Sequence, residues 1–299
     1  MNVLRSVALS VLFPRSRFES AAFADALAFL SAWPLHSVEF CYEGPDRTQV
    51  AEALARSGLE GIYIAVIPLK TQNLSLCDLD EPARRQAVTL AISCIETAAA
   101  LGCRSVMINS GRHPGAAWVE QGMRQFERSI AELHEVLAAK IPAGASAAMN
   151  LLLEPCDSHL DARNLIGPTA LATDLVRRLH QRYPALALTL DTAHIREEGE
   201  DFLAQLAQAT DCCNHLHFAN CVVDDPADPM YGDKHVGYDY PGSAFPPPIL
   251  ETIFRALPNL YGDCDCRIAL EILCREPDTQ AYFRHVVSQI PWFFTGGTP

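Results

Sequence analysis

Short apolar runs alternate with longer amphipathic stretches along the whole sequence, and this alternation limits the folds that the chain can adopt. Ala87, Leu90, Ala91 and Cys94 recur at the spacing of one helix face. Strands that alternate with helices predict parallel strands joined by crossover helices. The runs that predict strands are Leu4–Phe13, Ser37–Tyr42, Ile62–Ile67, Ser105–Ile108, Met149–Leu153, Ala185–Leu190, His215–Phe218 and Arg267–Leu270. The clearest helical patterns are Pro82–Leu101, Trp118–Ala139, Thr169–Arg182 and Phe202–Ala209.

Eight strand–helix units in 299 residues favour one barrel, since a barrel of eight β/α repeats typically needs about 250 residues. The rival is an open doubly wound sheet, which usually carries a glycine-rich loop after its first strand. The segment LSVLFPRSRFES has no glycine. No linker or low-complexity segment divides the chain. We therefore expect the α/β class, with residues 1–299 forming a single eight-stranded parallel β/α (TIM) barrel domain.

The composition argues against nucleic-acid and membrane partners. The formal charge is −13, from 36 acidic and 23 basic residues, and an acidic protein repels phosphate backbones. No stretch reaches the ~18 apolar residues of a membrane helix, and the N-terminal run Val7–Phe13 is interrupted by Ser10. The 11 scattered cysteines predict free thiols in a reducing compartment. We expect a soluble cytoplasmic protein, with its oligomeric state open and a homo-oligomer among the options.

Four successive predicted strands each deliver a carboxylate or an imidazole at the end where the strand stops. In a closed barrel the carboxyl ends of the strands surround one rim, so these side chains are expected to converge. The segments are NLLLEP with Glu154, LALTLDTAH with Asp191 and His194, HLHFAN with His215 and His217, and RIALEIL with Glu271.

Three carboxylates at close range cannot all ionise without a compensating positive charge, and a divalent cation can supply it. We expect Glu154, Asp191, His217 and Glu271 to bind one ion, because three oxygens and one nitrogen suit Mn²⁺, Mg²⁺, Co²⁺ or Zn²⁺. Asp191 alone could instead cap the helix that follows. We expect only one of His215 and His217 to face inward, and we prefer His217.

The series Glu154, Asp191-x-x-His194, His217 and Glu271 resembles the xylose-isomerase-like TIM-barrel superfamily of sugar isomerases and epimerases. That superfamily also includes dehydratases and endonuclease IV. The resemblance implies that Glu154 and Glu271 are the catalytic acid–base pair and that His194 binds a substrate oxygen. It also implies a divalent-metal-dependent isomerase or epimerase of a keto-sugar or cyclitol, acting through an enediolate. The chemistry is consistent, because a metal chelating adjacent oxygens stabilises the developing negative charge.

An unusually long connection, ANCVVDDPADPMYGDKHVGYDYPGSAFPPP, follows the seventh predicted strand and precedes a helix near Ile249. Long connections of this kind are often functional, and this one is expected to cover the barrel mouth. Its Asp233 and His235 bind substrate, hold a second metal as in the nuclease branch, or serve only the structure of the loop; we assign them to substrate binding. The basic residues that could face the mouth and bind a substrate carboxylate or phosphate are Lys70, Arg112, Lys234 and Arg275, of which we assign Lys70 and Arg112 to substrate binding. Asp157 and His159 could also touch substrate.

Other functions are compatible with the same scaffold. A metal-dependent dehydratase or lyase of a keto-cyclitol or dehydroshikimate-like compound shares the enolate chemistry. An endonuclease IV-like hydrolase is less favoured, since YIAVIPLK at the third strand has no histidine and the chain is acidic.

The acidic segment FANCVVDDPAD stands where the free-ketose epimerases carry an arginine, which argues against a simple ketohexose as the substrate. The acid–base pair argues against a non-catalytic binding protein. The substrate and the metal are left undetermined.

Overall fold

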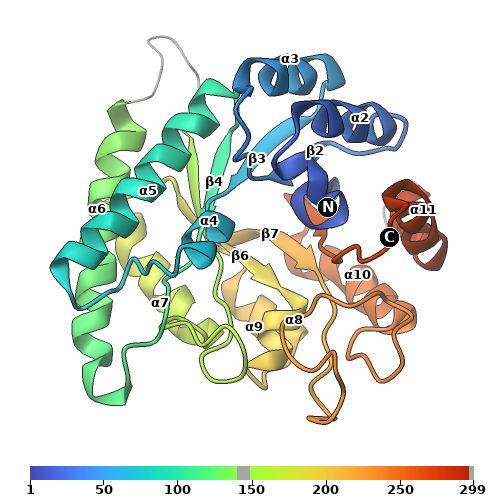
Figure 1. Ribbon diagram of the computed structural model, residues 1–299. Helices are drawn as coiled ribbons and strands as arrows, with labels where there is room; N and C mark the ends of the chain where they lie inside the picture. Colours follow the sequence, from blue (N-terminus) through green and yellow to red (C-terminus); the bar gives the residue numbers. More distant parts are fainter. Residues whose placement is uncertain (140–148, 296–299) are drawn as a thin grey trace.

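The eight strands close into one parallel barrel in sequence order, β1 to β8, so the sequence-based prediction of a TIM barrel is confirmed. The computed structural model describes residues 1–139 and 149–295, and Figure 1 looks onto the barrel. The strands are β1 (Asn2–Ala8), β2 (Ser37–Phe40), β3 (Glu60–Ile64), β4 (Ser105–Ile108), β5 (Asn150–Leu153), β6 (Leu186–Asp191), β7 (Cys213–Phe218) and β8 (Asp265–Leu270).

Helices surround the barrel as an outer layer (Figure 1). The long α5 and α6 carry apolar faces at helical spacing, and each buries that face against the strands or a neighbouring helix. The helices are α1 (Leu9–Leu12), α2 (Ser20–Leu30), α3 (Arg47–Ser57), α4 (Val66–Thr71), α5 (Glu81–Ala100), α6 (Val119–Ala139), α7 (Thr169–His180), α8 (Thr192–Glu197), α9 (Phe202–Ala209), α10 (Pro247–Tyr261), α11 (Thr279–Gln289) and α12 (Pro291–Phe294), with 3₁₀ turns at η1 (Pro14–Arg17) and η2 (Ala116–Trp118).

Two expected strands are shorter than the sequence indicated. The first run continues to Phe13, but β1 ends at Ala8 and Leu9–Leu12 form the helix α1. The third run continues to Ile67, but β3 ends at Ile64 and α4 begins at Val66. A short apolar run does not by itself distinguish a strand from one turn of buried helix, because both are buried on all sides. The other boundaries differ by a few residues at most.

The barrel interior is divided between an apolar and a polar half. Ile62, Met107 and Leu152 form a small buried cluster separate from the large core between strands and helices. On the other half, Arg267 of β8 binds Ser37 of β2 and lies 3.1 Å from Glu60 of β3. The strand register places polar Glu39, Thr189 and His215 on the same inward side, because paired residues of parallel strands project to the same face.

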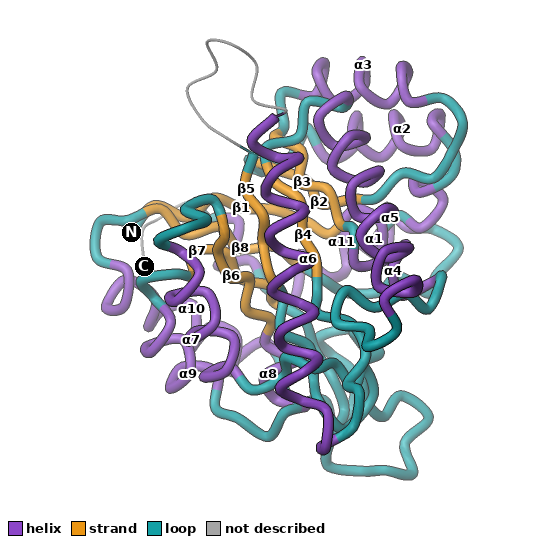
Figure 2. Tube along the Cα trace, turned by 90° about the vertical axis from the view of Figure 1, so that its left-hand side faces the viewer, coloured by secondary structure: helices purple, strands orange, loops and turns teal. Residues whose placement is uncertain are grey.

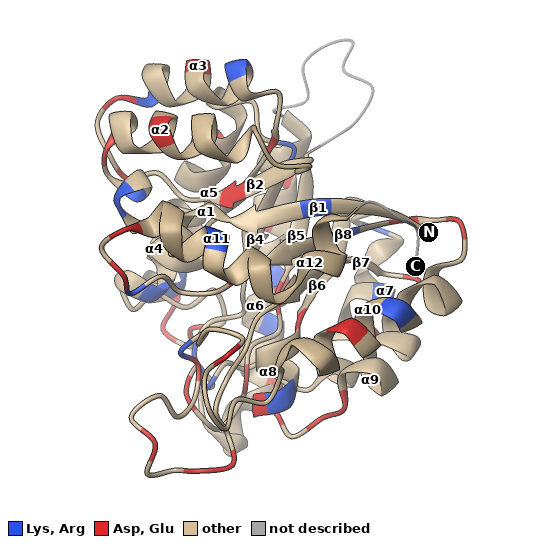
Figure 3. Ribbon diagram, turned by 90° about the vertical axis from the view of Figure 1, so that its right-hand side faces the viewer, with Lys and Arg blue, Asp and Glu red and all other residues tan. Residues whose placement is uncertain are grey.

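Loops gather at one end of the molecule, where the strands terminate and the long connection 219–246 lies (Figure 2). Acidic and basic residues both occur on these loops and on the outer helices (Figure 3). No helix within the described ranges combines the length and the hydropathy needed to cross a membrane. All 11 cysteines are free thiols, as expected from their scattered positions.

Candidate active site

The four proposed metal ligands meet at the carboxyl end of the barrel. Asp191 is the last residue of β6 and pairs in register with His217 of β7, after a register shift between Leu188 and Thr189. Glu154 and Glu271 directly follow β5 and β8. One ligand atom from each of the four residues lies within 4.8 Å of the other three. The tertiary structure therefore brings together the set that the sequence indicated.

The atoms that converge are those that the surrounding protein leaves without a hydrogen bond. His217 Nδ1 is 2.9 Å from Glu154 Oε1, 3.7 Å from Asp191 Oδ2, and in contact with Glu271 Oε2. Each of these four atoms is buried and has no hydrogen-bond partner among the described residues. Burial raises the pKa of Asp191, since a buried charge without a partner is costly. Unpartnered donor atoms of three carboxylates and one imidazole fit a divalent cation.

Asp191 uses one carboxylate oxygen as a helix cap and presents the other to the converging residues. Its Oδ1 accepts hydrogen bonds from the backbone N–H of Ala193 at 2.6 Å and of His194 at 3.1 Å, and so caps helix α8. The other oxygen, Oδ2, is the unpartnered atom that faces His217. The cap fixes the carboxylate plane, so that local structure holds Oδ2 in the position from which it would bind an ion.

Glu39 of β2 is a site residue that the sequence reasoning missed. Its two oxygens bind His215 Nε2 at 2.8 Å and His217 Nε2 at 3.0 Å, and the carboxylate is completely buried. Burial alone would raise the pKa of Glu39, but interaction with the two imidazoles lowers this pKa well below its usual range. With a proton on Nε2, His217 offers the lone pair of Nδ1 to the site. The carboxylate inside the otherwise largely apolar run SVEFCY was the available signal.

The expectation that only one of His215 and His217 faces inward is wrong. Both histidines are buried and both reach Glu39. Residues two apart in a strand project to the same face, so the two imidazoles necessarily share the interior. The preference for His217 as the residue near the ligand set agrees with the geometry, because His215 lies one step deeper, where its imidazole binds Glu39.

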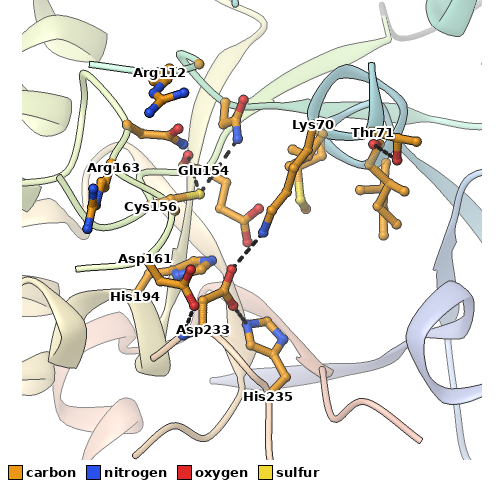
Figure 4. A pocket seen from close by; sticks show the side chains of 18 of the residues that line it. Lys70, Thr71, Arg112, Glu154, Cys156, Asp161, Arg163, His194, Asp233 and His235 are labelled. Carbon is orange, nitrogen blue, oxygen red and sulfur yellow. Dashed lines mark hydrogen bonds and ion pairs between the residues drawn. The ribbon is translucent and has the colours of Figure 1, made fainter. Parts of the chain in front are cut away.

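A cavity of about 750 Å³ opens above the ligand set, and Figure 4 shows its wall. Glu154 and Glu271 line this cavity, whereas Asp191 and His217 lie beneath it and are at most 1% exposed. The five residues proposed to bind substrate all contribute to the lining, which places them where a substrate could reach them. They are His194, Asp233, His235, Lys70 and Arg112.

The backbone around this cavity is unusual. Among the described residues, three that are not glycine have a positive φ, namely Asn73 at 53°, Arg163 at 50° and His235 at 43°. All three line the cavity. Residues other than glycine rarely adopt a positive φ, and those that do are concentrated at functional sites. The fold thus keeps three side chains in position at some conformational cost.

Asp233 forms a charge network with two of the other lining residues. Its Oδ2 is 2.9 Å from Lys70 Nζ and its Oδ1 is 3.0 Å from His235 Nε2 (Figure 4). Interaction with Asp233 raises the pKa of Lys70. Burial opposes protonation of His235, but the charges of Glu271 and Asp233 raise its pKa to about 9. Asp233 also groups with His194 and Glu197 in a second cluster that could hold a metal ion, so its role as a substrate ligand or as a second metal ligand stays a prediction.

His194 and the loop after β5 complete the wall. His194 Nδ1 lies 3.1 Å from Glu197 Oε2, and the imidazole also interacts with the Cys156 thiol. Asp157 does not face the cavity as a substrate ligand. It is fully buried, and its carboxylate accepts hydrogen bonds from four successive backbone N–H groups of residues 159–162. His159 is largely exposed beside Glu198.

Comparison with known proteins agrees with this architecture. The family model described as "Xylose isomerase-like TIM barrel" matches residues 25–282. A comparison with curated proteins returned no match. Solved structures with the same fold include a D-tagatose 3-epimerase-like protein, with a TM-score of 0.69 at 14% identity over 97% of this chain and 98% of the other.

Two further solved structures have the same fold as this chain. 3-Keto-D-glucoside 4-epimerase from E. coli has a TM-score of 0.64 at 14% identity, over 96% of this chain and 98% of that one. An AP endonuclease, family 2, from Brucella melitensis has a TM-score of 0.61 at 18% identity, over 98% and 97% of the two chains. At such identities the likeness concerns the fold, while the family match covers most of the sequence. The chain belongs to the xylose isomerase-like TIM-barrel family.

Proposed function

We propose that this protein is a divalent-metal-dependent isomerase or epimerase of a keto-sugar or cyclitol, with Glu154 and Glu271 as its acid–base pair. One observation carries the proposal. Of the four converging residues, only the two glutamates also line the cavity, and each has an unpartnered oxygen. They can therefore contact both the ion and a substrate, whereas Asp191 and His217 can contact only the ion.

The two glutamates come from β5 and β8, with β6 and β7 between them. One carboxylate can remove a proton from the carbon beside a carbonyl group, and the other can return a proton. Return to the opposite face of the same carbon gives epimerisation, and return to the neighbouring carbon through an enediolate gives isomerisation. A bound divalent ion would supply Lewis-acid stabilisation of the adjacent oxygens. His194 would orient a substrate hydroxyl or carbonyl oxygen.

The names of structural neighbours suggest the first substrates to test. Solved structures of the same fold include a D-allulose 3-epimerase in complex with D-allulose, a D-psicose 3-epimerase with D-tagatose and an L-ribulose 3-epimerase. We expect the protein, supplied with Mn²⁺ in D₂O, to incorporate deuterium beside the carbonyl carbon of a ketose or keto-cyclitol, as followed by NMR. A dehydratase would instead release an enone that absorbs in the ultraviolet, which would contradict the proposal in favour of the lyase.

Glu154→Gln and Glu271→Gln are each expected to reduce the rate of deuterium incorporation by about 10²–10⁴-fold, the usual contribution of a general acid or base. The matched control is Glu120→Gln, because Glu120 lies on α6 with a side chain that is 91% exposed. Circular dichroism should show the same fold for all three variants. A variant of Glu154 or Glu271 with nearly wild-type exchange would show that the two-carboxylate mechanism is wrong.

A further inference from the structure

Five basic residues line the cavity, and three of them already have partners. Lys70 is paired with Asp233. The other two with partners are Lys234, which binds Asp161, and Arg275, whose guanidinium donates to backbone carbonyl oxygens. The remaining two, Arg112 and Arg163, have no ion pair and no side-chain hydrogen bond within residues 1–139 and 149–295. Two unpaired guanidinium groups on one wall are notable in a chain with a net charge of −13.

The backbone holds Arg112 and Arg163 next to each other although they come from different loops. An antiparallel bridge joins Arg112 to Asn164, with the His113 N–H donating to the Arg163 carbonyl at 2.8 Å. The backbone N–H of Arg112 also donates to Ser75 Oγ at 2.9 Å. Figure 4 shows both arginines on the same side of the cavity, away from Lys70. These hydrogen bonds fix the backbone of both arginines in the cavity wall.

A third group at this place lacks a partner. Asn164 is only 5% exposed and lines the cavity, and its Nδ2 is a buried donor without a hydrogen-bond acceptor in the described chain. A buried amide donor that lacks an acceptor costs free energy comparable to a lost hydrogen bond. Two guanidinium groups and an amide N–H₂ are donors only, so they require an acceptor, and an acceptor with negative charge forms the strongest hydrogen bonds with them.

We propose that Arg112, Arg163 and Asn164 form an anion-binding subsite, which takes a phosphate or carboxylate group at the end of the substrate remote from Glu154 and Glu271. Together with the proposed function, on which this substrate assignment rests, the subsite makes the substrate a sugar phosphate or a sugar acid rather than a neutral ketose. Guanidinium groups bind both anions with paired hydrogen bonds. The local positive charge also attracts an anion that the acidic surface would otherwise repel.

The test uses three ligands that share one ketose end and differ at carbon six, namely D-tagatose, D-tagatose 6-phosphate and D-tagaturonate. Calorimetry with the Mn²⁺-supplied protein gives each dissociation constant, and inorganic phosphate serves as a probe without sugar stereochemistry. We expect at least one anionic sugar to bind about tenfold or more tightly than D-tagatose. The sugar phosphate and the sugar acid distinguish the two sources of the anionic group.

Arg112 and Arg163 are exposed to solvent, so Arg112→Gln and Arg163→Gln are each expected to weaken binding of the preferred anion by only about fivefold to tenfold. The double variant should lose the preference for the anion and the binding of inorganic phosphate. Arg124→Gln is the control, since Arg124 lies on the outer surface of α6 with a side chain that is 67% exposed.

The outcomes separate this inference from the proposed function. The inference is overturned if D-tagatose binds as tightly as both anions, or if the anion preference survives in the double variant. Binding of inorganic phosphate that depends on the two arginines, without deuterium exchange into any of the sugars, would support the subsite and count against the isomerase. Deuterium exchange into D-tagatose with no preference for an anion would do the reverse.

Discussion

At the scale of single residues, Glu39 shows how a buried charge can serve a neighbouring site. Its carboxylate joins two imidazoles and so fixes which nitrogen of His217 carries the proton. We expect Glu39→Gln to weaken Mn²⁺ affinity by about 10–100-fold, the usual effect of losing a carboxylate behind a metal-binding histidine. Competition with a chelator measures this affinity, with Glu52→Gln on the exposed face of α3 as the control. An unchanged Mn²⁺ affinity would show that Glu39 does not support metal binding by His217.

At the scale of elements, a buried arginine links α5 to α6. Arg84 of α5 is 1% exposed, and its guanidinium binds Glu132 of α6 at 2.8 Å, Ser129 of α6 at 2.9 Å and Glu81 at 2.9 Å. Replacement with alanine removes the packed aliphatic stem together with four charge-assisted hydrogen bonds, two of them to Glu81. The contact therefore belongs to the helix pair rather than to either helix alone.

We expect Arg84→Ala to lower the free energy of unfolding by about 2–4 kcal/mol. Arg85→Ala is the matched control, because Arg85 binds the same Glu81 from a side chain that is 71% exposed. An exposed pair contributes about 0–1 kcal/mol. Urea denaturation of both variants measures the difference. Equal losses in the two variants would show that burial does not determine the strength of this network.

At the scale of the whole molecule, the candidate metal site joins strands from half of the closed barrel. Ligands from β5, β6, β7 and β8 converge only when the barrel is folded, so a bound ion stabilises the folded state. At a hundred times its dissociation constant, Mn²⁺ should add about 2.7 kcal/mol, which corresponds to a rise in Tm of roughly 5 °C for a chain of this size.

Differential scanning calorimetry with Mn²⁺ and with a chelator measures this shift. The variant Asp191→Asn provides the control, because it keeps an N-cap oxygen for α8 but removes a ligand charge. Its Tm should respond little to added Mn²⁺. A wild-type Tm that does not change with the ion would contradict the metal assignment, whereas an equal shift in the variant would place the ion elsewhere.

Several features could be predicted before the structure because they depend on local sequence. The order of strands and helices follows from side-chain periodicity, and α9 has the predicted bounds, Phe202–Ala209. Carboxylates at the ends of successive strands indicated the rim of a barrel. The ends of β1 and β3 could not be placed, since a short apolar run fits a strand and a buried helical turn equally well.

The sequence by itself determined the barrel and the residues available at its rim, since periodicity and strand ends are encoded within short segments. Only the tertiary structure decided which atoms lack a partner and which residues meet. Glu39 lies 176 positions from His215, and the bridge between Arg112 and Asn164 joins two separate loops. Contacts of this kind depend on barrel closure and loop packing, which set distances that no local pattern records.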